Sequence, residues 1–187
     1  MSDAIQAGAG TVTADSPMRE VLAAWPGAQR TLFRQYHIGG CSSCAFSPDE
    51  TLGALCARNG GLDPAAVLAH LATSHEQDAR LLISPAELKA LRAADPAVRV
   101  VDIRSREEFE AVRLEGSELL SQDVMRSIMG DGSNTRPLVL VDHQGKNVLD
   151  AAAYFLGHGL QNVRCLRGGL DAWAVEVDPA LRRYRVG

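Results

Sequence analysis

The sequence of 187 residues lacks several features that would indicate a particular kind of partner. It contains no apolar run long enough to cross a bilayer, so we expect no membrane-spanning helix. It has no excess of basic residues, since 19 Lys and Arg stand against 23 Asp and Glu for a formal net charge of −4. That balance argues against nucleic acid as a partner. Internal repeats and low-complexity segments are absent as well.

The first residues also lack the marks of a secretory leader. Residues 1–14 carry neither a basic region nor an apolar stretch, and we expect them to form a disordered tail. The expected compartment is therefore the cytoplasm, where thiols start out reduced. The only cysteines are Cys41, Cys44, Cys56 and Cys165. Close spacing of two cysteines in a reducing compartment indicates redox or metal chemistry more than a structural disulfide.

The chain divides into two parts with different patterns. Between residues 15 and 75, four short segments with helical apolar spacing are bounded by Ser, Pro and Gly, which predicts a small all-helical domain. Ser16 and Ser47 each precede a proline and are the expected N-caps of the first and third helices. Residues 76–82 are the expected linker to the second part.

From residue 83 to residue 187, apolar strands alternate with helices. Strands are expected at 98–103, 137–141 and 162–166. Ser84 with Glu87, and Ser105 with Glu108, have the spacing of capping boxes at the starts of two helices. This alternation predicts an α/β fold, with a parallel sheet covered by helices on both faces.

Two motifs occur in order in this second part. They are Asp102, Arg104, Glu108 and Phe109, in an Asp-x-Arg-x-x-x-Glu-Phe pattern, and Gly168, Gly169 and Trp173, in a Gly-Gly-x-x-x-Trp pattern. Together they resemble the rhodanese-like family over residues 83–187. The resemblance implies a catalytic loop at the carboxyl end of the central strand, where open α/β sheets bind ligands. We expect Asp102 and Arg104 to form a structural charge pair rather than to contact a ligand.

The segment DHQGKN corresponds to the catalytic loop of that family. In active rhodaneses, a cysteine in a Cys-x-x-Gly-x-Arg loop takes sulfur from a donor and holds it as a persulfide. Aligning Gly145 with the family's glycine places Asp142 at the position of the cysteine and Asn147 at that of the arginine, and a shift of one residue places His143 there instead. Neither Asp nor His carries a persulfide, so conventional sulfurtransferase activity is not expected.

We therefore expect a degenerate rhodanese loop made of Asp142, His143, Gln144, Gly145, Lys146 and Asn147. Two interpretations stay open for it. Lys146, His143 and the loop amides could hold an oxyanion or a carboxylate of a partner, against which Asp142 would place a negative charge. Alternatively, the loop is a solvated turn without a ligand.

The first part carries the sharpest chemical signal. Cys41 and Cys44 bracket two serines after a Gly-Gly turn and before an expected helix. A cysteine near the N-terminus of a helix has its thiolate form favoured, which raises its reactivity. The surrounding pattern resembles a small helical domain of unassigned function, described as a redox-disulfide domain associated with hybrid-cluster proteins. The resemblance implies thiol redox, sulfur handling or metal binding. Cys41 and Cys44 are therefore the expected catalytic pair.

A metal at this pair would need further ligands. Structural zinc takes four ligands, and an iron–sulfur cluster also needs more than two. His37, four residues before Cys41, is the candidate third ligand. Cys56 shares a helical face with leucines and Cys165 lies within a strand, so both are expected in cores. No cofactor is firmly predicted, and zinc and an iron–sulfur cluster both stay open.

Three functions fit these patterns. The preferred hypothesis is a rhodanese-like protein of sulfur handling or thiol redox, with Cys41 and Cys44 as the reactive pair and a sulfur donor, sulfur acceptor or redox protein as partner. The alternative is a non-catalytic binding or regulatory module, a pseudoenzyme with a metal-binding or oxidation-sensing Cys-x-x-Cys pair. In the third, Cys165 or Cys41 serves the loop as the sulfur-transferring thiol. The patterns give no oligomeric state.

Overall fold

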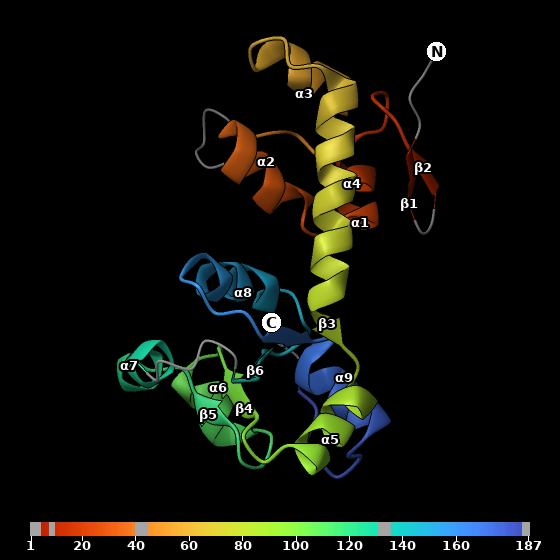
Figure 1. Ribbon diagram of the computed structural model, residues 1–187. Coiled ribbons are helices and arrows are strands. Elements are labelled where there is room, and N and C mark those ends of the chain that lie inside the picture. The colour runs from red at the N-terminus through yellow and green to blue at the C-terminus, as the bar shows by residue number, and fades with distance from the viewer. Residues whose placement is uncertain (1–4, 8–9, 40–44, 131–135, 185–187) are drawn as a thin grey trace. The chain divides into compact units, whose positions relative to one another are not determined.

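The computed structural model describes residues 5–7, 10–39, 45–130 and 136–184. The chain forms two compact units, residues 1–79 and residues 80–187 (Figure 1). Among the described residues, no helix combines the length and the apolar character needed to span a membrane.

The first unit is built from helices around one apolar core. The helices are α1 (Met18–Ala24), α2 (Ala28–Tyr36), α3 (Leu52–Arg58) and α4 (Pro64–Leu81), the last of which continues past the boundary of the unit. Met18, Leu32, Leu55 and Leu68 are among the side chains buried together in this core. Cys56 lies there too, as its helical face predicted.

The expected disordered tail is wrong for part of residues 1–14. β1 (Ile5–Ala7) and β2 (Gly10–Val12) pair in antiparallel fashion, with Ile5 opposite Val12. The Val12 side chain is buried in the core of the first unit. Composition suggested a tail because the segment is small and polar, but residues 5–7 and 10–12 are paired as strands, and Val12 belongs to the core.

The expected caps of α1 and α3 are each displaced toward the C-terminus. The N-caps are Pro17 and Thr51. The Met18 N–H donates to the Glu50 carbonyl at 2.8 Å, and the Leu52 N–H donates to the Ser16 carbonyl at 3.0 Å. The segments before the two helices therefore each supply a carbonyl to an unpaired N–H group of the other helix. In addition, the Thr51 side chain caps α3 by accepting from the Ala54 N–H at 3.2 Å.

The expected linker at residues 76–82 contains the boundary between the two units, after Ala79, but it is not a loop, because α4 runs through Leu81 and β3 (Leu82–Ile83) follows at once. No glycine or proline lies between residues 65 and 82 to end the helix. The Asp78 carboxylate forms a half-buried ion pair with Arg30 of α2. This contact ties the later turns of α4 to the first unit.

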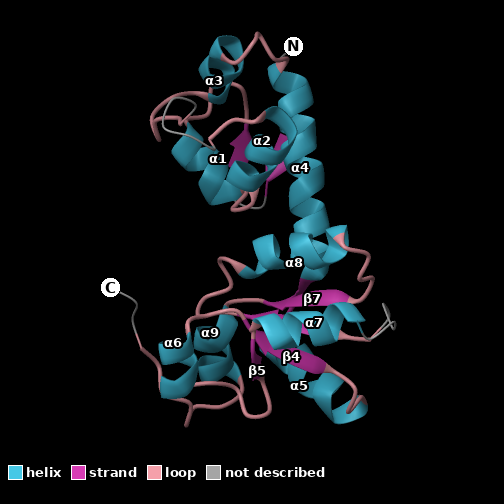
Figure 2. Cartoon of the chain, turned by 90° about the vertical axis from the view of Figure 1, so that its left-hand side faces the viewer, coloured by secondary structure: helices cyan, strands magenta, loops and turns pink. Residues whose placement is uncertain are grey.

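The second unit is a five-stranded parallel sheet between helices (Figure 2), which confirms the predicted fold class. The strand order is β3-β7-β6-β4-β5, and every pair is parallel. Its other strands are β4 (Arg99–Asp102), β5 (Glu118–Leu119), β6 (Leu138–Val141) and β7 (Val163–Leu166). Its helices are α5 (Pro85–Ala94), α6 (Arg106–Ala111), α7 (Gln122–Gly130), α8 (Val148–Gly157) and α9 (Gly169–Glu176). The capping boxes predicted at Ser84 and Ser105 are present.

Alternate residues of the central strands point to opposite faces of the sheet, as the strand period of two requires. Leu138 and Leu140 of β6 pack with side chains of α7 and α8, in the core that also contains Cys165. Val139 and Val141 pack on the other face, with Leu88 of α5 and other side chains of α5 and α9. Burial on both faces explains why β6 is continuously apolar.

Candidate functional site

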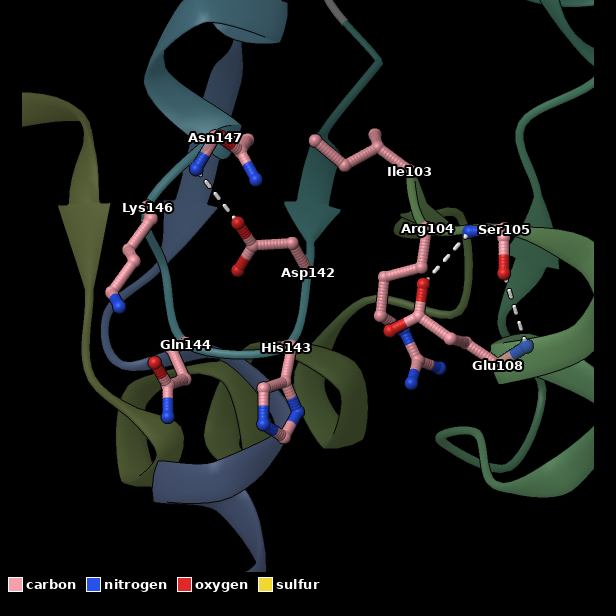
Figure 3. A pocket seen from close by; sticks show the side chains of 9 residues that line it. All are labelled: Ile103, Arg104, Ser105, Glu108, Asp142, His143, Gln144, Lys146 and Asn147. Atoms are coloured by element: carbon pink, nitrogen blue, oxygen red, sulfur yellow. Dashed lines mark hydrogen bonds between the residues drawn. The ribbon is translucent and has the colours of Figure 1, made fainter. Parts of the chain in front are cut away.

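The segment 142–147 forms a loop at the carboxyl end of β6, the central strand, and leads into α8. The neighbouring strand β4 ends beside it, so the turn after β4 faces the loop. Together they enclose a pocket of about 550 Å³ (Figure 3). The pocket is lined by Ile103, Arg104, Ser105, Glu108, Asp142, His143, Gln144, Lys146 and Asn147. This volume is in the range of small-molecule sites.

The carboxylate of Asp142 lies inside the loop rather than in solvent. The residue is 3% exposed. One carboxylate oxygen accepts a hydrogen bond from the Gly145 N–H. The other accepts one from the Asn147 N–H at 2.7 Å (Figure 3). Two loop N–H groups that could hold an external anion are therefore engaged by a negative charge belonging to the chain itself.

The start of α9 fixes the position of this loop. The Leu170 N–H donates to the Asp142 carbonyl at 2.9 Å, and the Asp171 N–H donates to the His143 carbonyl at 3.0 Å. Gly169 has φ +59°, and a Cβ atom there would lie 2.4 Å from the Asp142 carbonyl oxygen. A Cβ atom on Gly145, with φ +77°, would lie 2.7 Å from the Gly168 nitrogen. Glycine is thus required on both sides of the contact.

Asp102 and Arg104 form the buried charge pair that the sequence predicted, with side chains 1% and 3% exposed. The Arg104 Nε donates to Asp102 Oδ1 at 2.9 Å, and Nη2 donates to Oδ2 at 2.6 Å and to the Val112 carbonyl at 2.7 Å. Burial alone would lower the pKa of Arg104, but the hydrogen bonds to Asp102 and its charge raise that pKa above the ordinary value. The guanidinium is therefore a fixed cation at the pocket wall.

Tyr184 is a residue of this site that the sequence did not reveal. Its hydroxyl accepts a hydrogen bond from Arg104 and donates one to Glu108 Oε1 at 2.8 Å. Its ring lies 4.2 Å from that of His143, measured between centroids. These contacts join Tyr184 to residues between 41 and 80 positions away in the sequence, so no local pattern could have indicated them.

The environment of Glu108 favours its charged form. Burial would raise the pKa of Glu108, but hydrogen bonds from Tyr184 and Ser105 and the nearby charge of Arg104 lower it below the ordinary value. Burial also raises the pKa of Tyr184, which Arg104 opposes and Glu108 reinforces. At neutral pH the pair is therefore a neutral phenol donating to a carboxylate.

The expected reactive pair, Cys41 and Cys44, lies outside the described residues. His37, the candidate third ligand, is exposed and ends α2 in the left-handed conformation. Burial, followed by the charge of Asp63, raises the pKa of the Cys56 thiol. Within the described ranges, no three His, Cys, Asp or Glu side chains are grouped to hold a metal ion.

The third hypothesis required Cys165 to reach the loop. Cys165 is fully buried in β7, and its thiol donates to the Val148 carbonyl at 3.4 Å. It is not among the residues that line the pocket. The structure therefore confirms Cys165 as a core residue and does not bring it to the loop. His158 is an exposed residue at the end of α8.

Comparison with known proteins agrees with this architecture. The family model of the rhodanese-like domain matches residues 84–176. The thiosulfate sulfurtransferase GlpE of Pseudomonas aeruginosa is 31% identical over 91 residues, which are 49% of this chain and 81% of that protein. GlpE of Shewanella oneidensis is 32% identical over 77 residues, which are 41% of this chain and 76% of that protein.

Among solved structures, a rhodanese-like domain protein from Staphylococcus aureus is 22% identical, with a TM-score of 0.44, and the match covers 56% of this chain and 98% of that one. The match to the family model lies within the second unit, and it includes β4, the 142–147 loop and all of α9. Through residues 84–176, the chain belongs to the rhodanese-like family.

Proposed function

We propose that this chain handles sulfur or thiol redox equivalents through Cys41 and Cys44, while its rhodanese-like unit recognises a partner instead of carrying sulfur. The proposal is supported at the level of the family by relatives that are named thiosulfate sulfurtransferases. The observation that carries it is the Asp142 carboxylate, which accepts hydrogen bonds from the Gly145 and Asn147 N–H groups. In this proposal Asp142 stands at the position of the family's cysteine.

The Asp142 carboxylate opposes sulfur transfer at the loop for two reasons. It has no sulfur atom to accept the transferred sulfane sulfur. It is also a negative charge that a persulfide or thiosulfate would have to approach, and two such charges about 4 Å apart repel by about 4 kcal/mol at an effective dielectric constant of about 20. The Asp142 carboxylate adds a negative charge to the loop and occupies two of its N–H donors. The loop is therefore better suited to recognising a partner than to transferring sulfur.

The chemistry assigned to the pair is a balanced exchange. The Cys41 thiolate attacks the outer sulfur of thiosulfate, the S–S bond of thiosulfate breaks, and sulfite leaves with the electron pair. The Cys44 thiolate then attacks the inner sulfur of the Cys41 persulfide; the persulfide S–S bond breaks, the Cys41–Cys44 disulfide forms, and hydrosulfide leaves with the electron pair. The roles of the two cysteines are interchangeable in this scheme.

The test is intact-mass spectrometry of the anaerobically purified full chain, before and after treatment with thiosulfate. We expect one added sulfur atom on Cys41 or Cys44, or the loss of two hydrogens across that pair, and neither change in the variant that carries Cys41→Ser and Cys44→Ser. Cys56 and Cys165 are internal controls, since both thiols are buried. If Cys41 and Cys44 stay unmodified and also resist alkylation in the folded protein, the proposal is wrong.

A second function, a non-catalytic binding or regulatory module, is favoured by the same internal engagement of the loop. Cys41 and Cys44 would then hold a metal or sense oxidation. The native mass of the chain would include a metal that is lost on denaturation, and the double serine variant would keep the partner interaction. A thiol-exchange activity that disappears in that variant would count against this alternative.

A further inference from the structure

We propose that Tyr184 is an exchangeable internal ligand of a phenol-binding socket in the pocket wall, and that its departure exposes His143. The socket consists of Arg104, Glu108 and His143, all of which line the pocket beside the 142–147 loop. The inference deepens the recognition role proposed for this pocket and depends on that role for its biological meaning.

The socket is matched to a hydroxyl that both accepts and donates. Arg104 donates to the Tyr184 hydroxyl, and that hydroxyl donates to Glu108 Oε1 at 2.8 Å. The two partners are themselves fixed, because Arg104 is paired with buried Asp102 and Glu108 accepts from the Ser105 N–H at 3.2 Å. An apolar ring would leave both a buried donor and a carboxylate without these bonds, so the socket distinguishes a phenol from a benzene ring.

The ring of Tyr184 closes off an imidazole. The rings of Tyr184 and His143 are tilted by 35°, with centroids 4.2 Å apart, and the Arg104 guanidinium lies 5.8 Å from the Tyr184 ring centroid. Both ring nitrogens of His143 are buried and have no hydrogen-bond partner among the described residues. Burying an imidazole without hydrogen-bond partners is unfavourable. Docking of Tyr184 against His143 therefore costs free energy, and this cost is removed when Tyr184 leaves and water reaches the ring nitrogens.

The segment that carries Tyr184 is weakly attached elsewhere. Leu181 packs partly buried against the core of the unit, whereas Arg182 and Arg183 are exposed. Arg183 donates to the two Asp171 carboxylate oxygens at 2.7 and 3.0 Å, and solvent screens this pair because the Arg183 side chain is 57% exposed. Beyond Leu181, the described chain is held by the socket and by this solvent-screened ion pair. A partner that presents a tyrosine side chain can replace these bonds one for one.

The experiment measures the reactivity of His143 toward diethylpyrocarbonate, which acylates accessible neutral imidazoles, by peptide mass mapping of the full chain. We expect slow modification in the unaltered protein and modification faster by about tenfold or more in Tyr184→Ala, because the rate follows the open population. Tyr184→Phe keeps the ring but loses the hydroxyl bonds, so its rate should be intermediate. Added p-cresol should slow the reaction in Tyr184→Ala, and toluene should not.

The chain contains a matched control. Tyr154 stacks on His158 at 4.1 Å with a tilt of 34°, on the exposed face of α8 and away from the pocket. Tyr154→Ala should leave the His143 rate unchanged. Protection of Cys165 from alkylation reports that the second unit of each variant is folded, since this thiol is buried in its core.

Equal His143 rates in the unaltered protein, Tyr184→Phe and Tyr184→Ala would overturn the proposal. Equal protection by p-cresol and toluene would overturn the assignment of a phenol-specific socket. The readout involves neither Cys41 nor Cys44, so a failure of sulfur chemistry at that pair would leave it unaffected. The two proposals can therefore fail separately.

Discussion

At the scale of single residues, Asp142 decides what the loop can do. A buried carboxylate is tolerated only when its charge is compensated, and here the compensation comes from two loop N–H groups. The same donors would otherwise be available to a ligand. One side chain therefore both stabilises the loop and removes two of its anion-binding donors.

The residue-scale prediction concerns Asp142→Ala. Without the carboxylate, the Gly145 and Asn147 N–H groups lose their acceptor, and we expect the free energy of unfolding to fall by about 1–3 kcal/mol. Added thiosulfate should then stabilise the variant more than the unaltered protein, because the freed donors can bind it. Urea unfolding with and without thiosulfate measures both effects, and the unaltered protein controls for the general influence of salt.

If thiosulfate raised the stability of both proteins equally, the loop donors would not form an anion site even when freed. Asp142→Asn separates charge from shape, since it keeps an acceptor oxygen and removes the negative charge. We expect it to lose less stability than Asp142→Ala.

At the scale of elements, the contact between the loop and the start of α9 depends on backbone proximity. The two α9 N–H groups that donate to the loop carbonyls come within reach because Gly169 carries no side chain. The Gly-Gly-x-x-x-Trp pattern seen in the sequence is therefore a packing requirement of the site. Trp173 of the same pattern is buried beneath the sheet with Leu170, which anchors α9.

The element-scale prediction compares two glycine substitutions. Gly169→Ala places a Cβ atom against the Asp142 and His143 backbone at positive φ, and we expect a loss of more than about 2 kcal/mol. Gly157→Ala, in the last turn of α8 with no atom near the added Cβ, should be neutral or stabilise by up to about 1 kcal/mol. Urea unfolding measures the free energy of unfolding of both variants. A similar loss in both would show that the close contact between the loop and the start of α9 does not require glycine at position 169.

The helices of the first unit show where local sequence is a poor guide. Ser16 and Ser47 have the right neighbours for N-caps, yet the helices begin after Pro17 and Thr51. For α1 the reason is tertiary, because carbonyls of the segment before α3 accept from its first N–H groups. For α3 the cap is local but lies at Thr51, whose side chain accepts from the Ala54 N–H at 3.2 Å. Ser84 and Ser105, whose capping boxes depend only on residues three positions away, are predicted correctly.

At the scale of the whole molecule, the chain has separate cores in its two units, and each contains one buried cysteine. Cys56 lies in the core of the first unit and Cys165 in a core of the second. Side chains from residues 12–72 make up the first core, and those from residues 81–181 make up the cores on the two faces of the sheet. The two thiols can therefore report the unfolding of each unit separately.

The whole-molecule prediction uses this pair of reporters. Leu68→Ala should destabilise the first unit by about 2–5 kcal/mol, so Cys56 becomes open to alkylation at lower urea while Cys165 keeps its midpoint. Leu140→Ala should have the opposite effect. Pulsed alkylation followed by mass mapping measures both. A single common midpoint in every variant would mean that the units unfold as one.

The sequence by itself determined the fold class of the second unit, its capped helices, the Asp102–Arg104 pair and the burial of Cys56 and Cys165. These follow from periodicity, from contacts between residues close in sequence and from motifs of the family. Only the tertiary structure decided that the Asp142 carboxylate lies inside its own loop and that Tyr184 contacts Arg104, Glu108 and His143. The tertiary structure also decided the pairing of β1 with β2 and the backbone hydrogen bonds between the segments that precede α1 and α3. The physical reason is that these contacts join backbone and side-chain groups far apart in sequence, which become partners only when the chain is folded.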